Sequence, residues 1–75
     1  MNNNIMEGKW KQIKGEVRKR WGELTDDDVD RVQGSSEKLI GILQERLGHS
    51  QKQASDEVAD FMEKMEQRFS EKETA

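Results

Sequence analysis

The single histidine and four closely spaced aspartates are the side chains best suited to catalysis or metal binding. His49 stands alone in a chain without cysteine, which leaves too few ligands for a transition-metal site. Its place in a predicted turn favours a solvated side chain. Asp26, Asp27, Asp28 and Asp30 lack the glycine and the distal glutamate of a calcium loop. We therefore expect no catalytic residue, no cofactor and no metal ligand, and we predict that the protein is not an enzyme.

A strip of three cations is the surface feature best suited to recognise an anion or a partner. Lys11, Lys14 and Arg18 lie within about 60° of one another on a helical projection. Such a strip can contact phosphates or anionic lipid headgroups. It can equally pair with acids of the same chain, because residues 1–21 are net positive and residues 22–34 are net negative. We favour solvation or internal pairing, and we keep an anion-binding or partner-binding surface as the alternative.

These cations belong to a predicted amphipathic helix. The spacing predicts one helix from about Asn4 to Trp21, with Gly22 suited to a left-handed cap. Both Trp10 and Trp21 are expected in the core, because they share the apolar stripe. The stripe steps by three or four residues, as in a helix packed on a core, through Met6, Trp10, Ile13, Val17, Trp21 and Leu24.

A short second helix is predicted over about residues 26–33. Thr25 is a suitable N-cap, and the aspartates that follow suit the positive end of the helix dipole. Val29 and Val32 are expected to face inward.

Two longer helices are predicted in the second half. Either Ser35 or Ser36 caps the first of them, which Gly48 ends. Ser50 and Gln53 form the S-x-x-Q pattern of a capping box at the start of the last helix. The expected inward faces are Leu39, Ile40, Leu43 and Leu47, then Ala54, Val58, Phe61, Met62, Met65 and Phe69.

These elements predict an all-α fold, a small bundle arranged as two packed helical hairpins. One domain covers residues 1–69, and residues 70–75 form a charged, flexible tail. Gly15 and Gly41 lie opposite the core on the backs of their helices. Each costs about 1 kcal/mol relative to alanine, so either another chain approaches closely there or the cost is tolerated. We favour toleration.

Two motifs of the first half resemble the CsbD-like family: G-x-W-K-Q-x-K-G at residues 8–15 and W-G-x-L-T-D-D at residues 21–27. The second half agrees at residues 39–41 and 44–48, so the match covers roughly residues 5–63. The resemblance implies a compact bundle of four to five helices. It also implies a bacterial cytoplasmic protein associated with the general stress response. It brings no catalytic residues.

The remaining expectations concern partners and location. No stretch approaches the length of a membrane span, so a cytoplasmic protein is expected. We predict a monomer that acts by binding an unidentified protein. The alternatives are a hydrophilin-like protectant that acts by abundance, and a weak nucleic-acid binder that uses the basic first helix. We do not expect nucleic-acid binding at physiological salt, because three cations on a chain of net charge -3 give only weak attraction.

Overall fold

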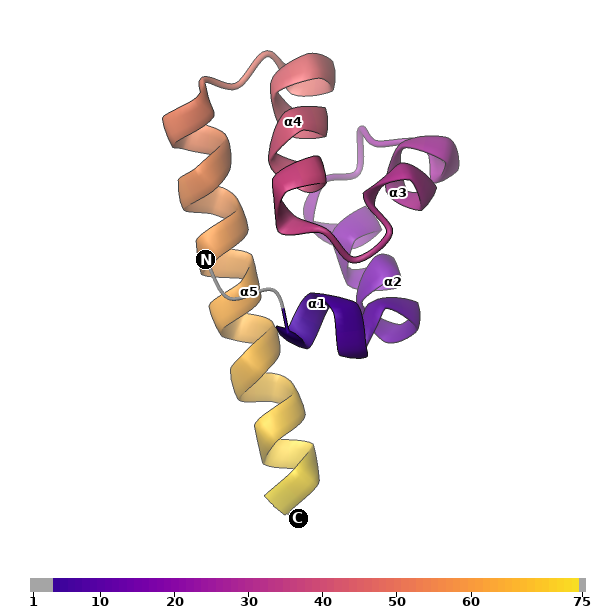
Figure 1. The fold of residues 1–75 in the computed structure, drawn as a ribbon, viewed down its shortest axis with the longest axis vertical. Coiled ribbons are helices and arrows are strands. Elements are labelled where there is room, and N and C mark those ends of the chain that lie inside the picture. The colour runs from indigo at the N-terminus through magenta and orange to yellow at the C-terminus, as the bar shows by residue number, and fades with distance from the viewer. Residues whose placement is uncertain (1–3, 75) are drawn as a thin grey trace.

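Five helices form the structure, a computed structural model that describes residues 4–74 along the backbone and residues 6–69 in their side chains. They are α1 (Asn4–Gly8), α2 (Trp10–Arg20), α3 (Asp26–Val32), α4 (Ser36–Leu47) and α5 (Gln51–Thr74). Helices α4 and α5 form one hairpin, and α2 and α3 form the other (Figure 1). Helix α3 also packs on α4, and α1 contacts both α2 and α5. The predicted all-α fold of two packed hairpins is confirmed.

The core is one continuous cluster of apolar side chains from all five helices and the α2–α3 turn. Most of the predicted inward faces are buried, but Ile42 replaces Ile40 on α4, because that helix packs on both α3 and α5 and buries a wider face. Trp10, Ile40 and Leu47 are only partly buried against the cluster. The buried members are Met6, Ile13, Val17, Trp21, Leu24, Val29, Val32, Leu39, Ile42, Leu43, Ala54, Val58, Phe61, Met62, Met65 and Phe69.

The predicted first helix is in fact two helices. Lys9 leaves the helical conformation, with φ -120° and ψ 21°, and separates α1 from α2. Gly8 makes this break inexpensive, because glycine is a poor helix former. For the same reason, the prediction that Trp10 lies in the core is met only in part, because Trp10 packs against the core cluster but is not fully buried. Trp10 becomes the first residue of α2, where it is only partly buried.

The break allows α1 to cross the α3–α4 turn at Gly34. A Cβ atom at Gly34 would lie 3.1 Å from the Glu7 Cα atom and 3.2 Å from the Met6 carbonyl oxygen. Gly34 also has a positive φ of 78°, a conformation that residues with a side chain rarely adopt. Position 34 therefore needs glycine twice over, for its backbone conformation and for the close approach of α1.

The helix ends match the predicted caps in part. The Thr25 hydroxyl accepts from the Asp28 amide and the Asp28 carboxylate accepts from the Thr25 amide, both at 3.1 Å, which completes a capping box. Ser35, and not Ser36, caps α4. The cap predicted at Gly22 is wrong: α2 ends at Arg20, and the chain leaves the helical conformation at Trp21, with φ -125° and ψ 76°.

The predictions for the end of α4 and for the two ends of α5 also differ in outcome. Gly48 ends α4, as predicted, and has a left-handed conformation. Ser50 accepts from the Gln53 amide at 3.1 Å, but the Gln53 side chain donates to Glu57, so only half of the expected capping box forms. Helix α5 continues to Thr74, into the predicted tail. The side chains from residue 70 onward and residue 75 lie outside the described part, so a flexible tail stays a prediction.

Candidate functional site

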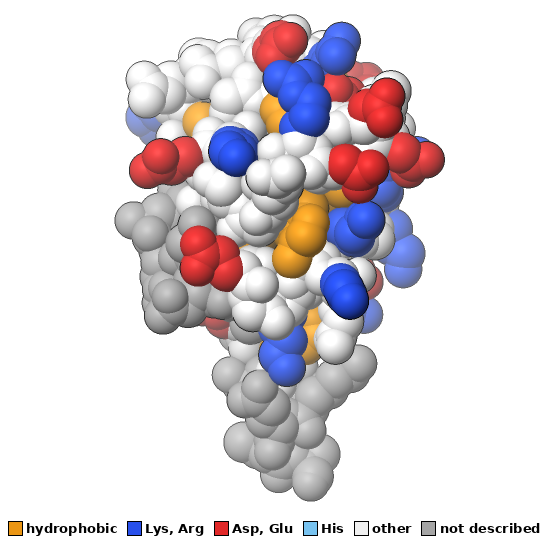
Figure 2. Space-filling view, turned by 45° about the vertical axis from the view of Figure 1, so that its right-hand side comes forward, with side chains coloured by type: hydrophobic (Ala, Val, Ile, Leu, Met, Phe, Trp, Pro, Cys, Tyr) orange, Lys and Arg blue, Asp and Glu red, His pale blue; other side chains and the backbone are white. Residues whose placement is uncertain are grey.

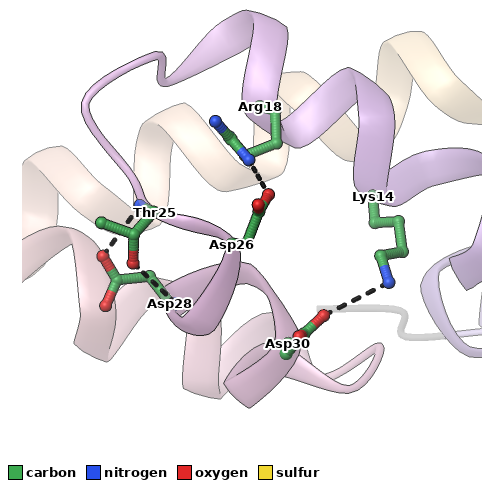
Figure 3. A network of polar contacts seen from close by, with 6 residues as sticks. All are labelled: Lys14, Arg18, Thr25, Asp26, Asp28 and Asp30. Atoms are coloured by element: carbon green, nitrogen blue, oxygen red, sulfur yellow. Dashed lines mark hydrogen bonds and ion pairs between the residues drawn. The ribbon is translucent and has the colours of Figure 1, made fainter.

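The three cations of the predicted strip all lie on the exposed side of α2, and two of them face α3. Lys14 Nζ is 3.2 Å from Asp30 Oδ1, and the Arg18 guanidinium pairs with Asp26 (Figure 3). Both aspartates are largely exposed, so each pair contributes little to stability. The pairs nevertheless offset the positive charge that an external anion would meet at these two positions.

Lys11 differs from its two neighbours in the strip. It is the one cation among the described side chains that has no hydrogen bond or ion pair within the protein. Figure 2 shows the consequence of such pairing on the face that includes α2 and α3, where basic and acidic side chains lie next to one another around small exposed apolar areas. The strip is therefore a mixed surface with one unpaired cation.

The other end of α2 carries a polar network that the sequence did not predict. The Trp21 ring is buried, 5.1 Å from the Phe61 ring centroid, and its indole N–H donates to Glu57 Oε1 at 2.9 Å. Glu57 Oε2 lies 3.2 Å from His49 Nε2 and accepts from the Gln53 amide at 3.3 Å. The Arg20 guanidinium lies over the Trp21 ring. We call these five polar and aromatic residues (Arg20, Trp21, His49, Gln53 and Glu57) the Trp21 network.

Glu57 is the centre of this network. Its pKa is lowered, chiefly because the Trp21 N–H bonds the carboxylate, with further contributions from His49, Gln53 and Arg20 that partial burial opposes. The solvated role predicted for His49 is wrong, since its side chain is 19% exposed and pairs with Glu57. A signal for Glu57 existed in the sequence, because it lies four residues before Phe61 and three after Ala54, on the apolar face of its helix.

A second acidic side chain, Asp28, is fully buried at the start of α3. Besides its part in the capping box, it accepts from Arg46 Nε at 2.9 Å and lies 3.8 Å from Arg31. Its pKa is lowered, first by the bond from the Thr25 backbone amide. The sequence predicts only that Asp28 and its neighbouring aspartates interact favourably with the helix dipole. For Asp28 the structure adds a tie between α3 and α4, which makes this residue part of the scaffold.

The Trp10 end of α2 is open by comparison. A groove of about 540 Å³ lies there, between α1, the first turn of α2 and the residue that follows α3. We call it the Trp10 groove; its lining residues are Glu7, Gly8, Lys9, Trp10, Lys11, Gln12 and Gln33. The described part of the chain offers no hydrogen-bond acceptor to the Trp10 indole. Since no polar side-chain atom there is completely buried without a partner, this N–H has some access to solvent.

The helix backs are not approached closely within the described chain. A Cβ atom at Gly15 or Gly41 would find no other atom within 4 Å. Within one copy of the chain, the cost of these glycines is therefore tolerated and not offset by close packing. Whether a second copy packs there is a separate question that the oligomeric state answers.

Two kinds of feature are absent from the described residues: a cluster of metal ligands and a membrane-spanning helix. Residues 6–69 contain no group of three or more His, Asp or Glu side chains placed to hold a metal ion. In the same part of the chain, no helix combines the length and apolar character needed to cross a membrane. The fold and its surface define a small five-helix bundle with the Trp21 network at one end of α2 and the Trp10 groove at the other.

Comparisons with known proteins identify the family. The CsbD-like family model matches residues 4–56. The chain is 48% identical over 65 residues to UPF0337 protein PA4738 of Pseudomonas aeruginosa. The aligned residues cover 87% of this chain and 100% of that protein. It is 44% identical over 69 residues to UPF0337 protein YjbJ of Escherichia coli K12, with 92% and 100% covered. The chain belongs to the CsbD-like family, and the resemblance read from its motifs is confirmed.

Proposed function

We propose that this protein is a non-enzymatic protein of the bacterial general stress response that acts in the cytoplasm, as a monomer, by binding another protein. The bacterial relatives support the setting, and the CsbD-like motifs carry the association with stress. The binding role needs support from the surface itself, because family membership brings no catalytic or binding residues.

The observation that carries the proposal is a difference between the two ends of α2: polar groups have partners within the protein at one end and lack them at the other. Around Trp21, the indole, the carboxylate and the imidazole all have partners inside the protein. Around Trp10, the indole N–H and the Lys11 ammonium have none, and they lie beside a half-buried ring. Protein interfaces combine exposed aromatic area with polar groups that need a partner, and tryptophan is enriched among residues that dominate binding energy.

Two observations weigh against the alternatives. The continuous buried core supports a protein with a specific surface over a protectant that acts by abundance alone. The pairing of Lys14 and Arg18 with aspartates of α3 leaves one free cation in the strip. One neutralised phosphate implies a salt slope of only about -1 and very weak nucleic-acid binding.

Affinity capture tests the proposal. Tagged protein is used as bait in nuclease-treated extracts of stressed and unstressed cells, at about 50 mM and about 200 mM salt. We expect a discrete protein, captured in a fixed ratio to the bait and retained at the higher salt. The proposal is contradicted if no protein is retained from these extracts while a parallel extract without nuclease yields only nucleic acid, and only at low salt. It is equally contradicted if heat-denatured bait protects a test enzyme from aggregation as well as folded bait does.

A further inference from the structure

The Trp10 groove presents hydrogen-bond donors beside an apolar surface. The Trp10 indole offers one N–H, and Lys11 offers an ammonium without a partner. Gln12 contributes a side-chain amide with no partner in the described chain. The oxygen of the Gln33 amide accepts from Lys38 Nζ at 3.4 Å, which leaves its nitrogen as a further donor. Indole and ammonium groups can only donate, so a complementary ligand must supply acceptors.

The charge of the groove further restricts the chemistry of the ligand that it can bind. Lys9 and Lys11 line it against the single acid Glu7, so its lining is net positive within a protein of net charge -3. Lys9 Nζ also lies 5.9 Å from the Phe69 ring centroid, which places this cation beside α5. Lys11 is therefore the cation best placed to pair with an external anion.

We propose that the Trp10 groove binds an acidic segment of a partner protein, in which a carboxylate pairs with Lys11 and an adjacent aliphatic side chain packs on the exposed side of the Trp10 ring. This assignment rests on the proposed function and names the chemistry of the partner. The groove volume of about 540 Å³ lies within the usual range of ligand-binding pockets. A mixed acidic and aliphatic segment satisfies both the donors and the ring.

A polyanion is a poorer occupant than such a segment. A nucleic acid tracks a row of cations, and the next cations along α2 are Lys14 and Arg18, which α3 already pairs. The carboxylate of Glu7 in the same groove would also repel a second phosphate. A peptide that presents one carboxylate and one aliphatic side chain avoids both conflicts.

The direct test is a titration of the isotope-labelled full-length protein, followed by its backbone amide and indole N–H resonances. The probe is a short capped peptide that alternates glutamate and leucine. The comparison probes are the same peptide with glutamine for glutamate, and a single-stranded oligothymidine of equal charge. We expect saturable shifts of the Trp10 indole and the Lys11 and Gln12 amides, with a dissociation constant of about 0.1–1 mM. The Trp21 indole is an internal control and should not move, because Glu57 already bonds it.

Other outcomes of this titration overturn the assignment. The absence of saturable shifts at millimolar peptide would do so, as would shifts centred on the Trp21 indole. Equal binding of the glutamine peptide would remove the role of the carboxylate. Tighter binding of the oligothymidine than of the acidic peptide would replace a protein segment by nucleic acid as the occupant.

Matched variants locate the contact. Lys11→Glu should weaken peptide binding by roughly tenfold or more, because repulsion replaces attraction at the contact. Lys19→Glu makes the same change of charge on the same helix, at a side chain that is 78% exposed and outside the groove, and should weaken binding less than about twofold. Trp10→Phe keeps an aromatic ring and removes the N–H, and should weaken binding by a few fold with the fold retained. Equal effects of Lys11→Glu and Lys19→Glu would contradict a local contact.

Affinity capture with the same variants separates this assignment from the proposed function. If wild type and Lys11→Glu capture the same partner equally well, the groove assignment is wrong and the proposed function stands. If no protein is captured while the peptide still saturates the groove, the proposed function is wrong and the groove assignment stands.

Discussion

The two tryptophans at the ends of α2 have the same side chain and belong to one apolar stripe, yet they differ in nearly every contact. Trp21 is 4% exposed, stacks near Phe61 and donates its N–H to Glu57. Trp10 is partly exposed and its N–H meets no acceptor in the described chain. The difference comes from what the second half of the chain supplies: α5 brings Glu57 and Phe61 to Trp21, while Trp10 stays only partly buried. We call the Trp21 end the closed end, because its indole N–H has a partner within the protein, and the Trp10 end the open end, because its indole N–H has none in the described chain.

Truncation of each tryptophan should show the largest contrast. Trp21→Ala is expected to cost about 3–5 kcal/mol, because it removes a buried ring and leaves the Glu57 carboxylate without its donor. A domain of this size has a total stability of about 4–11 kcal/mol, so the variant should be partly or wholly unfolded. Trp10→Ala should cost less than Trp21→Ala, because Trp10 is only partly buried and so loses less buried apolar area. Urea unfolding followed by circular dichroism measures both.

One result would contradict this contrast between the two tryptophans. If Trp10→Ala lowers the urea midpoint as much as Trp21→Ala does, the Trp10 ring is covered in solution. The open groove is then not a property of the free protein.

Substitution of Gly34 should give the next largest effect, at the turn that supports the open end. Gly34→Ala is expected to cost about 1–3 kcal/mol, because it combines a positive φ with the close approach of α1. Gly48→Ala is the matched control, since Gly48 also has a positive φ, of 70°, but no other atom within 4 Å of a Cβ. Thermal unfolding of both variants isolates the contribution of α1 as their difference. Equal losses would show that α1 does not pack on Gly34.

Neutralisation of Glu57 tests the closed end through its pH dependence. Its folded-state pKa is lowered below the ordinary value of 4.5, so the folded state binds fewer protons there than the unfolded chain. This stabilisation is complete above about pH 4.5 and is lost as the pH falls through the folded value. Glu57→Gln should lower the free energy of unfolding at neutral pH by about 1 kcal/mol and make its acid dependence shallower.

The control for this prediction lies on the same helix. Glu63→Gln changes an exposed glutamate of α5 and should leave both the stability and its pH dependence nearly unchanged. Unfolding curves between acidic and neutral pH compare the two variants. A Glu57→Gln variant with the wild-type acid dependence would contradict the Trp21 network as a determinant of stability.

The smallest expected effect is a gain. Gly15→Ala and Gly41→Ala should each raise the free energy of unfolding by about 0.5–1 kcal/mol, because alanine favours helix and both positions are open. Urea midpoints measure the gain, and sedimentation equilibrium checks that wild type and variants are monomers. A loss of stability together with a loss of self-association would instead assign these helix backs to an interface between copies.

The helical fold could be predicted from the sequence wherever one local signal decided the outcome. The N-cap at Thr25, the end of α4 at Gly48 and most of the apolar stripes depend on residues within a few positions of each other. The break at Lys9 could not, because a stripe with steps of three and four suits one helix as well as two. That break follows from the packing of α1 on α5 and on Gly34, which are distant along the chain.

The candidate site was harder to predict than the fold, for the same reason. Charge blocks on α2 and α3 made internal pairing the favoured interpretation of Lys14 and Arg18, and both face aspartates of α3. The environment of Lys11 differs because of where α3 ends. The residues near Lys11 in the sequence do not determine that position. The contact between Trp21 and Glu57 joins residues 36 positions apart. No spacing rule within one helix identifies such a partner.

Hydrogen exchange of the two indole N–H protons in the unmodified protein tests the central claim most directly. Both protons give separate nitrogen-correlated resonances, and removal of either tryptophan assigns them. The Trp10 proton should exchange almost as fast as that of a free indole, because it has access to solvent and no acceptor in the described chain. The Trp21 proton should exchange slower by orders of magnitude, because its release from Glu57 requires opening of the core. Similar protection of the two protons would contradict the account, since α2 would then have no open end.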